Sequence, residues 1–161
     1  MKELFEKLPE ITNPQILIDT CFIYWVYENQ HEKQFHEFCN KHKVALTSFT
    51  IEELIYHAHH VNKHARSRLR KELKEKNLQL HKYSQPVHPG KPQEQKNYIQ
   101  KHQPELLEII PDNSDSILVI ASIQTKANIL TRDKHHLFTA QLNNYLQEKN
   151  IQVYNNISEI E

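Results

Sequence analysis

The residues of this sequence that are best placed to do chemistry together are four acids, each next to an apolar run: Asp19, Glu53, Asp115 and Asp133. Carboxylates forced close together repel one another, which raises their pKa values and opposes folding unless a cation neutralises them. Oxygen ligands without a nearby cysteine or a histidine cage favour Mg²⁺ or Mn²⁺ over Zn²⁺. Such a site suits phosphodiester hydrolysis, because the ion activates a water molecule and stabilises the leaving oxygen.

These acids can meet only if strands position them, and the apolar runs predict such strands. Strands are expected at residues 15–18, 44–47, 78–83, 129–131 and 151–154. Helical patterns separate them, which predicts an α/β fold with a central, mainly parallel sheet in a single domain over residues 1–161. Because ligands bind beyond the carboxyl ends of parallel strands, all four acids are expected at one edge of the sheet.

The helices between these strands are expected over residues 22–40, 50 to about 76, about 94 onward, 115–126 and 137–149. Ser114 is the expected N-cap of the fourth of these helices, whose apolar content predicts that it is buried. The segment 84–93 is expected to be a loop, because it holds three prolines and a glycine.

Composition excludes several common classes of protein. Gly90 is the one glycine of the chain, so neither a P-loop nor a GxGxxG dinucleotide turn can be built. The 20 basic and 20 acidic residues balance, which argues against non-specific coating of DNA. Cys21 and Cys39 form no disulfide framework and suit a reducing cytoplasm. The apolar runs are too short to span a bilayer and the first residues lack a signal-peptide layout, so neither a membrane nor secretion is expected.

Three segments resemble the PIN-domain nucleases, a family that includes the VapC-like toxins: ILIDTCFIYWV from Ile16, LTSFTIEEL from Leu46 and DSILVIASIQTKANILTRDKHHL from Asp115. The resemblance implies a Rossmann-like three-layer α/β/α sandwich, weaker over about 58–111, where a less typical helical and loop segment is expected. It implies that the four acids hold Mg²⁺ or Mn²⁺ and that the protein is an endoribonuclease, whose products carry a 5′-phosphate and a 3′-hydroxyl.

The resemblance also implies residues and partners around this site. Thr20 and Thr131 are expected to orient the acids by hydrogen bonds. Family members often carry a second acid or an asparagine near the TRD segment, where this chain has His135 and His136, so the fourth ligand there departs from the family pattern. An RNA substrate is implied, and so are a small antitoxin that covers the pocket and a homodimer.

Two of the four acids also have structural interpretations. Glu53 and Thr50 fit a capping box, which would satisfy the backbone at the start of a helix. Glu52 is the alternative ligand, because periodicity places neither glutamate on the apolar face. Asp115 fits the electrostatic preference for an acid at a helix N-terminus.

A basic segment between residues 59 and 82 carries eight lysines and arginines against two glutamates, and it fits an RNA backbone. Its candidate RNA-binding residues, with one more from the TRD segment, are Lys63, Arg66, Arg68, Arg70 and Arg132. A solvated helix face is the alternative interpretation of this charge.

Three alternatives to the nuclease stay open. The cluster His57-Ala58-His59-His60 fits zinc by composition alone, without a nearby cysteine. The histidines after the TRD segment and the unfamiliar middle of the chain fit a non-catalytic RNA-binding or assembly module. Asp19 after the first strand also fits a phosphoaspartate phosphatase or receiver, although Cys21 stands where the dehalogenase-type pattern needs a second aspartate.

Overall fold

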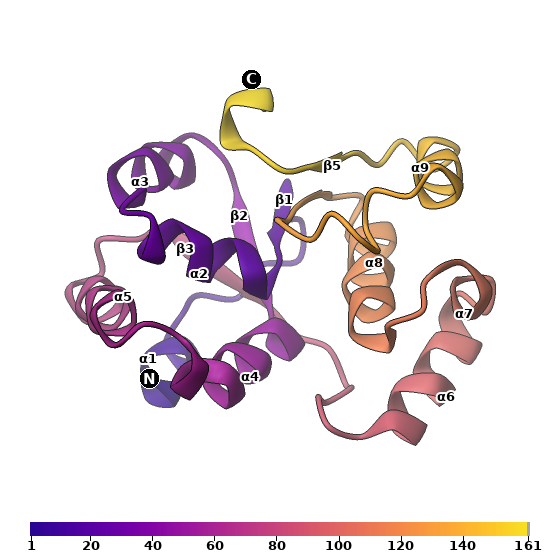
Figure 1. Cartoon of the computed structure of the whole chain (residues 1–161), viewed down its shortest axis with the longest axis horizontal. Coiled ribbons are helices and arrows are strands. Elements are labelled where there is room, and N and C mark those ends of the chain that lie inside the picture. The colour runs from indigo at the N-terminus through magenta and orange to yellow at the C-terminus, as the bar shows by residue number, and fades with distance from the viewer. Residues whose placement is uncertain (161) are drawn as a thin grey trace.

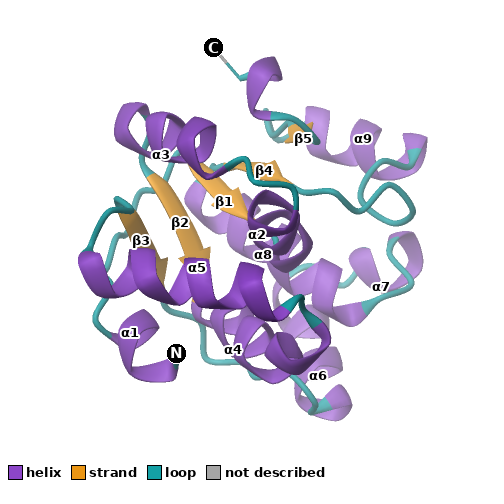
Figure 2. Cartoon of the chain, turned by 60° about the vertical axis from the view of Figure 1, so that its left-hand side comes forward, coloured by secondary structure: helices purple, strands orange, loops and turns teal. Residues whose placement is uncertain are grey.

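The computed structural model, which describes residues 1–160, contains one five-stranded sheet between two layers of helices (Figures 1 and 2). The strands are β1 (Ile16–Ile18), β2 (Val44–Thr47), β3 (Leu80–Tyr83), β4 (Asn128–Leu130) and β5 (Val153–Tyr154). Their order is β3-β2-β1-β4-β5, and every neighbouring pair is parallel. The predicted fold class, an α/β three-layer sandwich with a parallel sheet, is therefore confirmed.

The helices fall into two groups along the chain, which Figure 1 separates to the left and right of the sheet. The first group is α1 (Lys2–Glu6), α2 (Thr20–Glu28), α3 (Glu32–Lys41), α4 (Ser48–Tyr56), the 3-10 turn η1 (His57–His60) and α5 (Lys63–Glu75). The second group is α6 (Pro92–His102), α7 (Leu106–Ile109), α8 (Asn113–Thr125) and α9 (Ala140–Gln147), and the chain continues to the 3-10 turn η2 (Ile157–Glu159).

The alternation of side chains along the strands explains why the sheet carries a core on each face. Ile16 and Ile18 of β1 pack in the cluster that holds the buried faces of α2, α3 and α5. Leu17 points the other way, into the cluster that holds α6, α8 and α9. Since β1 is buried on both faces, it is a continuous apolar run, as expected for a central parallel strand.

The strand order places a topological switch at β1. The chain proceeds from β1 outward to β2 and β3, then returns to β4 on the other side of β1 and continues to β5. Crossover connections leave β1 and β4 in opposite directions at such a point, so a crevice opens beyond their carboxyl ends. The residues that follow these two strands are Asp19 and Thr131, and the Asp19 amide donates to the carbonyl of Leu130 at 3.0 Å.

One long helix expected over residues 22–40 is instead two helices, so this prediction is wrong in its middle. Gln30 takes a left-handed backbone, with φ of 59°, between α2 and α3. A left-handed residue ends a helix because it cannot continue the hydrogen-bond ladder. The reversal lets α3 bury Phe35 and Phe38 against the same cluster as α2.

The helix expected from residue 50 to about 76 is also broken. α4 ends at Tyr56, η1 follows, and the side chain of Asn62 accepts from the His64 amide at 2.8 Å to start α5. The helix over 115–126 begins earlier than expected, because Asp112, not Ser114, is its N-cap. It is buried as predicted, with every side chain from Ser116 to Ser122 inside.

Two further expectations concern the cysteines and membranes. Cys21 and Cys39 lie in α2 and α3 and are both free thiols. Across residues 1–160, none of the helices has the length and apolar character needed to cross a bilayer.

Candidate functional site

A pocket of about 750 Å³ opens beyond the carboxyl ends of β1 and β4, and all four predicted acids line it. Asp19 follows β1, Glu53 projects from α4, Asp115 from the first turn of α8, and Asp133 from the loop after β4. The fold thus brings together acids that are up to 114 positions apart, from Asp19 to Asp133. A further acid, Asp112, lines the same pocket.

Asp19 is the most constrained of these acids. Its Oδ1 accepts from the Thr20 amide at 2.7 Å, which makes Asp19 the N-cap of α2. Its Oδ2 accepts from the Thr131 hydroxyl at 2.7 Å and from the Cys21 thiol at 3.0 Å. The contact with Thr131 is the orienting hydrogen bond expected of that residue. Donors from two elements thus fix the rotamer of the carboxylate at the switch point.

Glu53 does not form the capping box that its spacing from Thr50 suggests, so this interpretation is wrong. Thr47 is the N-cap of α4 and its hydroxyl accepts from the Thr50 amide at 3.0 Å. The Glu53 Oε2 instead accepts from the hydroxyl of Thr20 at 2.9 Å, across the pocket. Glu52, the alternative ligand, pairs with His88 at 2.8 Å outside the pocket.

Asp115 meets a histidine, His136, beside the pocket. Its Oδ2 lies 2.8 Å from Nδ1 of His136, and the same nitrogen lies 3.6 Å from Oδ2 of Asp133. The other oxygen of Asp133 accepts from the amides of His135 and His136 at 2.8 and 3.4 Å. Asp133 therefore shapes the loop that turns His136 toward Asp115.

The electrostatics of the pocket favour protonation of its acids. Burial, together with the charge of Asp19, raises the pKa of Glu53 to about 7, although hydroxyls of Thr20 and Ser114 act in the opposite direction. Burial and the charge of Asp19 likewise raise the pKa of Asp115 to about 7. The pKa of Asp19 is also raised, chiefly by burial. Without a counter-charge, these carboxylates oppose one another.

The donors present fit a hard divalent cation. One ligand atom each of Asp112, Asp115 and His136 lies within 4.8 Å of the other two. Octahedral ligands at about 2.1 Å from Mg²⁺ lie about 3 Å apart when adjacent and about 4.2 Å apart when opposite. The 2.8 Å between Asp115 and His136 is close to the adjacent spacing, whereas the 4.8 Å limit of the group is slightly wider than the span around one ion. The set is oxygen-rich, with a single imidazole nitrogen and no thiolate ligand, which fits Mg²⁺ or Mn²⁺.

Cys21 borders the site without the properties of a nucleophile. Its Sγ accepts from the Arg132 amide at 3.2 Å, and burial and the Asp19 carboxylate raise the pKa of the thiol far above its ordinary value. A thiol that stays protonated is unreactive. Its contribution is a hydrogen bond that holds Asp19.

Four of the expected RNA-binding residues lie on α5, and the fifth, Arg132, lies in the acidic pocket. Arg132 lines the acidic pocket, and its guanidinium carbon lies 4.3 Å from the centroid of the Trp25 ring. The guanidinium also donates to the Asn155 carbonyl at 2.9 Å. Arg66 donates to the carbonyl of Ala58 in η1 at 2.9 Å.

The other three basic candidates lie on α5, as Arg66 does. Arg68 pairs with Glu32 and donates to the Tyr27 carbonyl, while Lys63 is exposed at the first turn of the helix. Arg70 lines a different pocket, which includes none of the acids named above. Arg132 is thus separate from the four residues of α5, and RNA binding by the five stays a prediction.

Several residues lie in or beside the pocket that the sequence alone does not predict there. Asp112 has the local signature of an N-cap, and it does cap α8, accepting from the Ser114 amide at 2.8 Å. His136, a departure from the family pattern, lies beside the pocket and contacts Asp115 at 2.8 Å. His57 and His60 of η1 also line the pocket. In residues 1–160, the histidine run of η1 does not form a group of three clustered potential metal ligands, whereas Asp112, Asp115 and His136 do.

Comparisons with known proteins bear on the fold. No protein-family model matches the sequence, and no curated protein matches it. The structure is similar to the crystal structure of PAE2754 from Pyrobaculum aerophilum, with a TM-score of 0.51 and 12% sequence identity over 95% of this chain and 92% of that chain. FitAcB from Neisseria gonorrhoeae gives a TM-score of 0.46 and 17% identity over 87% of this chain and 96% of that chain, a likeness too low to support an argument. At these identities, the likeness to PAE2754 shows a shared fold alone.

Proposed function

We propose that the acidic pocket binds Mg²⁺ or Mn²⁺ and hydrolyses phosphodiester bonds in RNA. The observation that carries the proposal is the convergence of five carboxylates, from Asp19, Glu53, Asp112, Asp115 and Asp133, on one pocket at the switch point of the sheet. Buried like charges cost folding free energy, so a cluster of this kind needs a ligand that neutralises it. RNA as the substrate rests on the resemblance to PIN-domain nucleases.

Each residue has a distinct role in this proposal. Asp19, Asp115 and Asp133, which line the pocket, hold the cation in this proposal. Asp112 and His136, whose ligand atoms cluster with that of Asp115, are additional candidate ligands. When bound, the cation supplies an activated water and neutralises charge on the phosphate.

Glu53 orients the attacking water or holds a second cation. A pKa near 7 lets its carboxylate accept a proton from water at neutral pH. The threonine hydroxyls, from Thr20 and Thr131, hold Glu53 and Asp19 in place. Arg132 is the basic residue nearest to this chemistry and is the proposed phosphate contact, because it alone of the five basic candidates lines the pocket.

A second candidate function is a non-catalytic RNA-binding or assembly module. The contact between His136 and Asp115 favours it, because a protonated imidazole could supply the missing positive charge without a metal. The Asp115 carboxylate raises the pKa of His136, which favours that charged state. An antitoxin over the pocket and a homodimer remain predictions of the family resemblance.

The test is cleavage of a panel of labelled single-stranded and hairpin RNAs by the purified protein, with Mg²⁺, Mn²⁺ or EDTA. The proposal expects cleavage with metal only, and its loss in Asp19→Asn, a variant of nearly unchanged shape. RNA binding by both proteins without cleavage under any condition would select the non-catalytic module. Cleavage that persists in EDTA or in Asp19→Asn would place the activity elsewhere.

A further inference from the structure

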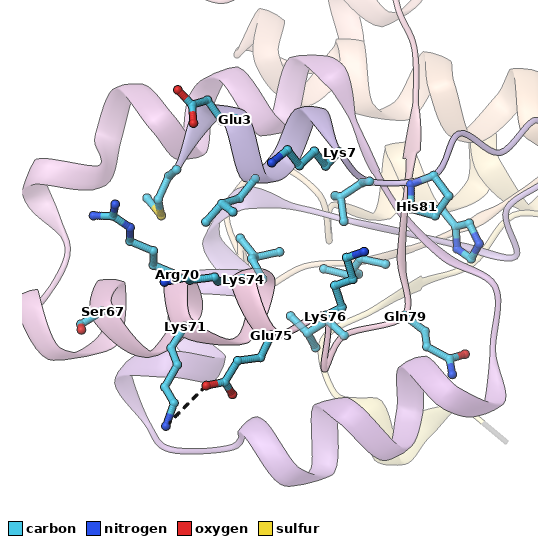
Figure 3. Close-up of a pocket in the computed structure, with 17 residues that line it drawn as sticks. Glu3, Lys7, Ser67, Arg70, Lys71, Lys74, Glu75, Lys76, Gln79 and His81 are labelled. Carbon is cyan, nitrogen blue, oxygen red and sulfur yellow. Dashed lines mark ion pairs between the residues drawn. The ribbon is translucent and has the colours of Figure 1, made fainter.

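A groove of about 1170 Å³ lies between α1, the second half of α5 and the start of β3 (Figure 3). It shares no lining residue with the acidic pocket. Its lining combines an apolar floor with a charged rim, and neither has a role in the proposed nuclease. We call it the basic groove.

The floor of the basic groove is made of aliphatic side chains. Leu73, Leu78 and Leu80 are buried beneath it, with 7%, 7% and 1% of their surface exposed. Leu4 and Leu8 are only partly buried and pack against the same core cluster. Apolar surface that is concave and incompletely covered gains free energy when another apolar surface covers it.

The rim of the basic groove is positively charged. Its basic residues are Lys7, Arg70, Lys71, Lys74 and Lys76, and its acidic residues are Glu3 and Glu75, an excess of three positive charges in a chain whose 20 basic and 20 acidic residues balance as a whole. Lys71 pairs with Glu75 at 3.9 Å, the dashed line in Figure 3. In the described part of the chain, Arg70, Lys74 and Lys7 have no ion-pair partner.

Arg70 and Lys74, two cations of α5 that lack an ion-pair partner in the described structure, are one helical turn apart. Residues four apart lie on the same face, so Arg70 and Lys74 present a pair of cations along one wall of the groove. Lys7 comes from the opposite wall, just after α1. An extended row of cations beside an apolar floor is complementary to a segment with acidic residues on one side and apolar residues on the other.

We propose that the basic groove binds an acidic, amphipathic segment of a partner protein. Apolar side chains of that segment cover Leu4, Leu8 and Leu73, and its carboxylates pair with Arg70 and Lys74. The apolar floor favours a peptide over a nucleic acid, because an RNA backbone offers phosphates without aliphatic side chains. This inference is independent of the proposed nuclease.

Binding of two labelled probe peptides to the full chain, followed by fluorescence anisotropy, tests the proposal. The first is an amphipathic helical peptide with leucines on one face and glutamates on the other, and the second carries lysines in place of the glutamates. We expect the acidic peptide to bind at least about tenfold more tightly than the basic one. Charge reversal by Arg70→Glu with Lys74→Glu should weaken binding of the acidic peptide by at least about tenfold.

The matched control is Lys96→Glu with Lys101→Glu, which makes the same charge change on exposed positions of α6. It should leave the affinity for the acidic peptide within about twofold. A milder pair, Arg70→Gln with Lys74→Gln, keeps the test valid if the reversed variant unfolds.

Three results would overturn the proposal. The first is an acidic peptide that binds the wild-type protein no more tightly than the basic peptide does, or that binds the charge-reversed variant as tightly as the wild type. The second is loss of single-stranded RNA binding in the reversed variant, which would make the groove a nucleic-acid surface. The third is a dimer, seen by sedimentation, that dissociates in the same variant, which would make a second copy of this chain the occupant.

Discussion

The acidic pocket and the basic groove are both rich in charge, but the chain builds them in opposite ways. Carboxylates meet in the pocket from the end of β1, from α4, from α8 and from the loop after β4, and Asp115 and Asp133 expose only 14% and 22% of their side chains. The groove draws most of its charge from one helix, and there Lys71 and Glu75 expose 72% and 48%.

This difference separates two kinds of functional surface. Carboxylates that are crowded and partly buried lower the stability of the fold until a cation binds to them. Such a cluster therefore indicates a site where chemistry requires these carboxylates. Exposed lysines and arginines on a helix cost little and remain available to a partner. The pocket should therefore respond strongly to small substitutions, and the groove only to changes of its net charge.

The largest expected effect compares two neighbouring glutamates of α4. Glu53→Gln should lower the rate of RNA cleavage by about a hundredfold, because Glu53 lines the pocket and bonds to Thr20. Glu52→Gln should change it by no more than about twofold, because Glu52 pairs with His88 outside the pocket. Single-turnover cleavage assays measure both. Equal losses in the two variants would contradict the assignment of Glu53.

A smaller effect is expected from the hydroxyl that orients Asp19. Thr131→Val removes the donor to Oδ2 of Asp19 and the acceptor of the Asp133 amide, while it keeps the shape of the side chain. We expect an approximately tenfold loss of cleavage rate and about 1 to 2 kcal/mol of lost stability, since Thr131 is fully buried. Thr139→Val, at the N-cap of α9, is the control for the loss of a hydroxyl alone. A rate in Thr131→Val as high as in that control would argue against the orienting role.

The pH dependence of stability is a further way to distinguish the pocket. The fold raises the pKa of Glu53 to about 7, so the unfolded chain ionises first and the wild type loses stability as pH rises through neutrality. In EDTA at pH 8, Glu53→Gln should thus be more stable than the wild type by about 1 kcal/mol, and the difference should vanish near pH 4. Thermal unfolding across this range measures it. A variant that is less stable than the wild type at pH 8 would contradict the account.

The smallest effect should come from the groove. Arg70→Glu with Lys74→Glu should leave the rate of RNA cleavage within about twofold, because neither residue lines the acidic pocket. The comparison of kcat/KM with the wild type at physiological ionic strength checks this. A loss of more than about tenfold would indicate that the acidic pocket and the basic groove bind the same RNA, which is the interpretation that the basic segment of the sequence suggests.

Local sequence was enough to place at the edge of the sheet the residues that directly follow a strand. Asp19 and Thr131 directly follow short apolar runs, and parallel pairing of those runs brings them together. The fold class followed from the same alternation of strands and helices. The single domain over residues 1–161 remains a prediction.

Other residues could not be placed from the sequence, because their roles depend on contacts between distant elements. Asp112 has an ordinary capping role that conceals its place in the pocket. His136 reaches Asp115 only because the loop after β4 folds back over α8. Arg68 has the same helical environment as Arg70, but a tertiary contact with Glu32 engages it.

The central claim is that the acidic pocket is a divalent-cation site, and calorimetric titration with Mn²⁺ tests it most directly. The account predicts that the wild-type protein binds Mn²⁺ and that Asp115→Asn binds it at least about tenfold more weakly, with Glu52→Gln unchanged. A wild-type protein that binds no Mn²⁺, or an Asp115→Asn variant that binds it as tightly as the wild type, would contradict the account.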